Sequence, residues 1–194
     1  GSTACNKSTM AGPIHMMKTA AAAKGKMLLY TMGDNEVTDC HRGWYRTGKA
    51  GPPYIPSEYY NSEAARSMLV DEFNLKQKTD VTGKFYVDTQ SDACPFHKYA
   101  EKCGMAIVTL EVAGSDWGLA GGGSTYPRMD EVDPISQRIE GYVRAKDCAL
   151  SWLDQSVAKA KAAGLTSMLI AFQAEMFTVE TTSGYYNWGK AIET

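Results

Sequence analysis

The sequence lacks the features that define several common classes of protein. It contains no apolar run that approaches the ~20 residues of a membrane-spanning helix. It also lacks the basic excess of a nucleic-acid-binding protein, since its formal net charge is −2. We therefore expect no transmembrane segment and no nucleic-acid partner.

Motifs for zinc ribbons and for nucleotide-binding loops are also missing. No CxxC pair occurs, and the closest cysteines, Cys94 and Cys103, are separated by eight residues. The glycine-rich stretch at residues 118–127, GLAGGGSTYP, has neither the lysine of GxxxxGK[ST] nor the spacing of GxGxxG. These absences exclude a zinc ribbon and argue against a phosphate-binding glycine loop.

The start of the chain has no signal peptide, and residues 1–7 read as the start of a mature or trimmed product. Two readings of the five cysteines stay open: two disulfides with one free thiol, or five reduced thiols. Asn6-Lys7-Ser8 is a glycosylation sequon. Together these features favour an extracellular protein or one in an organellar lumen.

The overall composition of the sequence is that of a folded domain. Hydrophobic residues make up 44% of the 194 residues and charged residues 22%, which is ordinary for a globular protein. No internal repeat or linker divides the chain. We predict one domain over residues 1–194, or a fragment of one.

The pattern of apolar residues predicts an α/β fold, a layered sheet flanked by helices. After an irregular lead-in over residues 1–13, helical spacing covers residues 14–24, 63–73 and 135–163. Apolar runs predict strands at residues 27–31, 105–113 and 167–172. Residues 84–87 form a shorter strand candidate, followed by a predicted loop over residues 88–94.

Acidic residues follow several of these apolar runs. Functional groups of α/β sheets gather beyond the carboxyl ends of the strands. One rim is therefore predicted to collect Asp34, Asp39, Glu111, Asp116 and Glu175. Glu111 stands near the end of a buried strand, where an acid needs a partner or must face a cleft. A plain polar turn after Gly33 explains the first two acids equally well, since Gly, Asp and Asn are common turn residues. His41 and Arg42, just beyond Asp39, fit either a phosphate or metal contact or the polar edge of that turn.

Four segments resemble one branch of the calcineurin-like metallophosphoesterases. Residues 30–42 read YTMGDNEVTDCHR, similar to the branch motif YTPGDNEWTDCHR. Residues 108–119, VTLEVAGSDWGL, are similar to its VTLHVVGSNNGL. The helix at residues 144–164 and the strand LIAFQAEMF at residues 169–177 also match, in the expected order. The resemblance implies a metallophosphoesterase-like layered α/β(β)α sheet, either complete or incomplete in this chain.

The resemblance also implies which residues bind metal. In this family two metal ions activate a water and clamp a phosphoryl group. Asp34 takes the place of the bridging aspartate, and Asp39 and His41 flank it. His97 falls at the position of an asparagine ligand, and Glu111 at that of a histidine ligand. Asp34, Asp39 and Glu111 are thus the candidate metal ligands, and His41 and His97 the candidate catalytic residues.

Several parts of the family's site have no counterpart in this sequence. The opening D-x-H strand is missing, the paired asparagines are Asp116 and Trp117, and the aspartate of QAD is Glu175. Two explanations fit: a fragment of an active enzyme with altered ligands, or a degenerate relative that kept the scaffold. The implied cofactors are divalent Mn, Fe, Zn or Mg, or no metal at all in the degenerate case.

We therefore predict a metallophosphoesterase-like protein with a degenerate metal site, acting as a binding or structural component of an assembly. The alternative is an active metal-dependent phosphatase or phosphodiesterase that hydrolyses a phosphate ester. A third hypothesis is a carbohydrate- or matrix-binding module. Aromatic residues in predicted loops would contact assembly partners, although they could equally cover the protein's own core: Trp44, Tyr45, Tyr54, Tyr59, Tyr60, Trp117, Tyr126, Tyr185, Tyr186 and Trp188.

Overall fold

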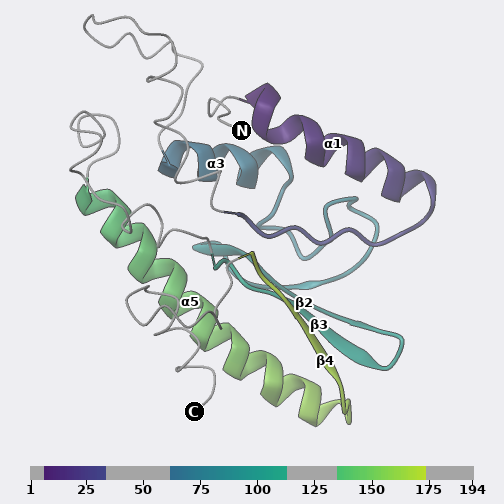
Figure 1. Ribbon diagram of the computed structural model, residues 1–194. Helices are drawn as coiled ribbons and strands as arrows, with labels where there is room; N and C mark the ends of the chain where they lie inside the picture. The colour runs from purple at the N-terminus through teal and green to yellow at the C-terminus, as the bar shows by residue number, and fades with distance from the viewer. Residues whose placement is uncertain (1–6, 34–61, 113–134, 174–194) are drawn as a thin grey trace, which may run out of the picture.

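The computed structural model describes residues 7–33, 62–112 and 135–173, in which two helices are followed by three strands, a third helix and a fourth strand (Figure 1). Over these residues the helices are α1 (Lys7–Ala23), α3 (Ser62–Glu72) and α5 (Ile135–Ala162). The strands are β1 (Asp88–Ser91), β2 (Cys94–Lys102), β3 (Met105–Thr109) and β4 (Met168–Ala171). The predicted α/β class is therefore confirmed.

The four strands form one mixed sheet in the order β1-β2-β3-β4. β1 pairs antiparallel with β2, and β2 pairs antiparallel with β3. β3 and β4 are parallel, with Thr109 opposite Ala171, and α5 lies between them in the sequence. Because they are parallel, β3 and β4 end at the same edge of the sheet.

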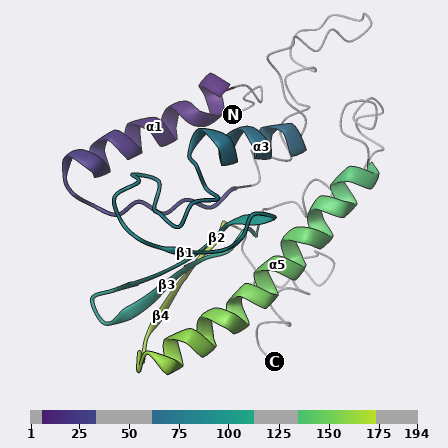
Figure 2. The same cartoon turned by 180° about the vertical axis from the view of Figure 1, so that it is seen from behind.

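Helices cover both faces of the sheet. Figures 1 and 2 show α1 and α3 on one side and α5 on the other. Two apolar clusters fill the spaces between these layers. The first packs α1 and α3 around Phe96, and the second packs α5 around Tyr99 and Val108. The first seven residues of β2 are consequently buried.

The apolar run after α1 does not form the predicted strand. Its backbone pairs with the loop around Asp80 instead: the Leu28 N–H donates to the Asp80 carboxylate at 2.9 Å, and the Leu28 carbonyl accepts from Val81 N–H at 2.9 Å. Asp80 also accepts the N–H groups of Lys84 and Phe85, both at 3.1 Å. The Asp80 carboxylate thus accepts the Leu28 N–H, which in a sheet would donate to the carbonyl of a neighbouring strand.

Three other parts of the predicted element pattern are wrong. Residues 88–94 are not a loop, since β1 occupies most of them, and residues 84–87 contribute only an isolated bridge between Tyr86 and Thr79. The lead-in is helical from Lys7, and Pro13 lies inside α1. Burial of Met10 and Ile14 in the core offsets the hydrogen bond that Pro13 removes. The helices at residues 63–73 and 135–163 are confirmed within a residue at each end.

A disulfide joins Cys94, at the start of β2, to Cys148 in α5. Cys103 is a free, exposed thiol in the turn between β2 and β3. Among the described helices, none combines the length and the apolar character that a membrane span requires.

Candidate functional site

Glu111 is delivered to the end of the sheet by β3, two residues beyond the last strand residue, Thr109. Its neighbours Leu110 and Val112 are almost fully buried, and Glu111 itself is 1% exposed. A carboxylate at such depth needs compensation by a cation or by hydrogen bonds.

Arg66, from the middle of α3, supplies that compensation. Its Nε donates to Glu111 Oε1 at 2.9 Å, and its Nη2 donates to Oε2 at 3.2 Å. Nη2 also donates to the Ala93 carbonyl at 3.1 Å, in the turn between β1 and β2. The guanidinium lies 5.1 Å from the ring centroid of Phe96. Arg66 therefore links three segments of the chain through one buried group.

His97 lies on the other side of Glu111. Its Nε2 accepts the Glu111 N–H at 3.2 Å and lies 4.0 Å from Glu111 Oε2. Burial, and then the Arg66 cation, lower the pKa of His97 from 6.5 to about 3, while the backbone of Cys148 acts in the opposite direction. The ring is therefore neutral at physiological pH, with Nε2 as an acceptor.

A second ion pair joins α5 to α3 near Arg66 and Glu111. Arg144 of α5 donates to Glu63 of α3 at 2.8 Å, and both side chains are partly exposed. Burial raises the pKa of Glu111, and Arg66 and Arg144 oppose that rise. We refer to Glu63, Arg66, His97, Glu111 and Arg144 as the rim cluster.

Three members of the rim cluster, Arg66, His97 and Glu111, are buried, and the cluster is close to charge balance. Two carboxylates face two guanidinium groups, and the histidine is neutral. Such a group fixes the relative positions of α3, α5 and the end of β3. As it stands, no carboxylate oxygen of Glu111 is without a hydrogen bond from Arg66.

The sequence-predicted residues divide into two sets. The structure brings His97 and Glu111 together, with His97 Nε2 4.0 Å from Glu111 Oε2. The other candidates lie outside the described residues: Asp34, Asp39, His41, Asp116 and Glu175. Within residues 7–33, 62–112 and 135–173, no group of three His, Cys, Asp or Glu side chains could hold a metal ion.

The segment after α1 is attached to the end of β3. Thr31 Oγ1 donates to the Leu110 carbonyl at 2.8 Å. The backbone at Thr31 is thereby fixed beside the residue preceding Glu111.

Sequence reasoning missed Arg66 entirely. The need of Glu111 for a partner was visible in the sequence, but nothing local marks the partner, which lies 45 residues away. One signal was present: Arg66 interrupts the apolar stripe of α3, between the buried Ala65 and Leu69.

Comparison with family models, with curated proteins and with solved structures finds no match to this chain.

Proposed function

We propose that this chain is a metallophosphoesterase-like protein in which an internal ion pair has replaced part of the metal site. It would act as a non-catalytic binding or structural component of an assembly. The proposal includes the finer fold, a metallophosphoesterase-like layered sheet, and it rests on the sequence resemblance together with the geometry of the rim cluster.

One observation carries the proposal: the two-point hydrogen bonding of Glu111 by Arg66. The resemblance puts Glu111 where the family has a metal-binding histidine. Here a guanidinium supplies the positive charge at that position. Arginine remains protonated at all physiological pH values, so the compensation is permanent.

The described residues do not by themselves fit a two-metal centre. Glu111 directs both oxygens at Arg66, and Nε2 of His97 is occupied by a backbone N–H. A cation approaching Glu111 would also meet the Arg66 charge. We therefore derive no reaction step through a metal at this position.

One observation favours the alternative, an active phosphoric ester hydrolase. His97 of β2 and Glu111, just beyond β3, approach to 4.0 Å between Nε2 and Oε2, and Thr31 bonds the neighbouring Leu110. In that case Asp34 would be a metal ligand, with Mn, Fe, Zn or Mg as the metal, and Asp39 and His41 would be further ligands or phosphate contacts. His97 and Glu111 could join them only if His97 Nε2 released the Glu111 N–H and Glu111 released Arg66.

An extracellular or luminal location is part of the proposal. The Cys94–Cys148 disulfide supports it, because disulfides persist mainly in oxidising compartments. Protein partners remain proposed for the aromatic residues of the predicted loops, all of which lie outside the described residues.

The test is metal content of protein purified without chelator, together with hydrolysis of p-nitrophenyl phosphate in the presence of manganese. We expect no stoichiometric metal and no turnover, and no effect of Asp34→Ala. The matched control is Asp92→Ala, since Asp92 is an exposed aspartate outside the rim cluster. Close to two metals per chain, with turnover that Asp34→Ala abolishes and Asp92→Ala does not, would establish the hydrolase instead.

A further inference from the structure

The outer side of α1 exposes apolar side chains to solvent. Met10, Ala11 and Ile14 are buried and hold the inner side of the helix against the core. Met16 and Met17 follow Ile14 by two and three residues, which places Met16 on the opposite side of the helix and Met17 beside it. Met16 is 70% exposed and Met17 is 49% exposed. The helix itself lies at the periphery, on the side of the sheet opposite α5 (Figures 1 and 2).

The rest of this outer side is also uncharged. Pro13, Met16, Ala20 and Ala23 follow one another at steps of three and four residues, so they share one face, and all four are exposed. Single exposed apolar residues are normal on a protein surface, whereas a continuous apolar face marks a site of interaction. The outer face of α1 is apolar along most of the helix.

Three lysines gather at the C-terminal end of α1. Lys24 directly follows Ala23, the last helical residue, and Lys26 comes two residues later; both are exposed. Lys84, from the segment before β1, reaches the same end, where its Nζ donates to the Ala22 carbonyl at 3.0 Å. Among the described residues, no carboxylate forms an ion pair with any of these three ammonium groups. Their positive charges therefore remain uncompensated.

The surroundings of α1 contain little accessible negative charge. Residues 1–33 include four lysines and no aspartate or glutamate, although the whole chain has a formal net charge of −2. Glu72, which contacts α1, is bound by Lys7 and His15. Asp80, which contacts the run after α1, is 3% exposed and accepts backbone N–H groups. This side of the molecule is thus both basic and apolar.

We propose that α1 binds the surface of a membrane that contains anionic lipids, through Met16, Met17, Lys24, Lys26 and Lys84. A helix that lies in a membrane interface combines an exposed apolar face with lysines beside it. Lipid headgroups supply the negative charge, and the acyl chains accept the apolar side chains, whereas a nucleic acid would leave both methionines in water. Methionine is flexible and adapts to a fluid surface. The inference is independent of the rim cluster and of the function proposed above.

The test is co-sedimentation of the full chain with vesicles of phosphatidylcholine alone and with vesicles of an equimolar mixture with phosphatidylglycerol. We expect binding to the mixed vesicles only, and weaker binding as the salt concentration rises. Met16→Gln should weaken this binding roughly tenfold, and Lys24→Gln should weaken it about fivefold. The matched controls lie on α5: Val143→Gln, at a residue that is 47% exposed, and Lys161→Gln, at an exposed lysine, should leave binding unchanged.

Methyl NMR spectra in bicelles of the same mixed lipids provide a second readout, because they report insertion as well as attraction. A spin-labelled lipid should broaden the Met16 methyl signal, which is assigned by its absence from the spectrum of Met16→Gln. The signal of the fully buried Met32, assigned through Met32→Leu, should stay sharp.

The proposal is overturned by absence of binding to the mixed vesicles, by equal binding to both kinds of vesicle, or by equal losses for Lys24→Gln and Lys161→Gln. Binding of polyglutamate without binding of vesicles would also overturn it, and would identify an acidic protein as the partner of this surface.

Discussion

A single arginine connects most of the groups at the carboxyl end of β3. Arg66 reaches from α3 to Glu111, to the Ala93 carbonyl and over the Phe96 ring. Bringing this charge out of water is costly, and its attraction to Glu111 offsets the cost only while both partners are present. Arg66 and Glu111 are therefore best regarded as one unit.

Replacing Arg66 by methionine should expose that dependence. Arg66→Met leaves the buried Glu111 without its cation, and we expect a loss of about 3–5 kcal/mol in the free energy of unfolding. Urea denaturation measures this loss. The double variant Arg66→Met with Glu111→Met should recover most of it, because no buried charge is left uncompensated.

The control for this pair is Arg144→Met. Arg144 and Glu63 form an ion pair of similar length, 2.8 Å, but both are partly exposed. Water screens such pairs, so the cost should stay below about 1 kcal/mol. Equal losses for Arg66→Met and Arg144→Met would contradict the assignment of the buried pair.

His97 should make stability depend on acidity. The folded protein protonates His97 only near pH 3, whereas the unfolded chain does so near pH 6.5, because burial and Arg66 lower its pKa. Between these two pKa values the unfolded state binds protons more strongly than the folded state, so the free energy of unfolding falls as the pH falls. His97→Gln should reduce this decline by about 1.4 kcal/mol per pH unit, measured by urea denaturation at several pH values.

The comparison is a variant at an exposed residue without a titrating side chain. Ser167→Ala should leave the acid-side slope unchanged. A slope that is the same in the wild type and in His97→Gln would show that another group controls the decline.

Among the elements, helices were easier to predict than strands. The stripes of α3 and α5 repeat at helical spacing, and both helices begin and end within one residue of the predicted bounds. β2 was missed because its sequence, CPFHKYAEK, contains two buried polar residues, His97 and Lys98. Lys98 is satisfied by distant oxygens, the Gln77 carbonyl at 2.9 Å and Thr89 Oγ1 at 2.7 Å among them. No local pattern reveals such partners.

The apolar run at residues 27–31 shows the opposite error. It has the composition of a buried strand, yet it does not pair with the sheet, because the Leu28 N–H donates to the side chain of Asp80 in a loop. The candidate site was likewise predicted only in part. Glu111 could be predicted as a site residue from its place after β3, whereas its partner Arg66 could not, because it lies 45 residues away in the sequence.

The disulfide between β2 and α5 should contribute strongly to stability. Cys94 and Cys148 are 54 residues apart, and closing a loop of that length in the unfolded chain corresponds to about 4 kcal/mol. The double variant Cys94→Ala with Cys148→Ala should lose stability on this scale in thermal denaturation under oxidising conditions. Cys103→Ser, at the exposed thiol, serves as the control and should cost far less.

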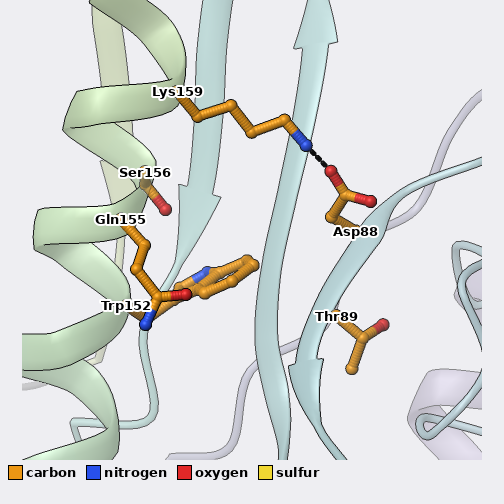
Figure 3. A pocket seen from close by; sticks show the side chains of 6 residues that line it. All are labelled: Asp88, Thr89, Trp152, Gln155, Ser156 and Lys159. Atoms are coloured by element: carbon orange, nitrogen blue, oxygen red, sulfur yellow. Dashed lines mark ion pairs between the residues drawn. The ribbon is translucent and has the colours of Figure 1, made fainter.

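At the scale of the molecule, α5 serves two regions. Its first half supplies Arg144 to the rim cluster, and its second half lines a pocket against β1 with Trp152 and Lys159 (Figure 3). The disulfide at Cys148 lies between the two regions and joins the helix to β2. Both regions are therefore attached to one helix whose position is fixed by a covalent bond to the sheet.

The burial of β2 also determines how the molecule opens. β2 is paired on both edges and covered by helices on both faces, so its backbone reaches water only when the sheet itself comes apart. α1 is held differently, by a short apolar contact around Met10 and Ile14 and by surface pairs to Glu72. Partial unfolding should therefore begin with release of α1, while the strand that carries His97 keeps its place until the last cooperative step.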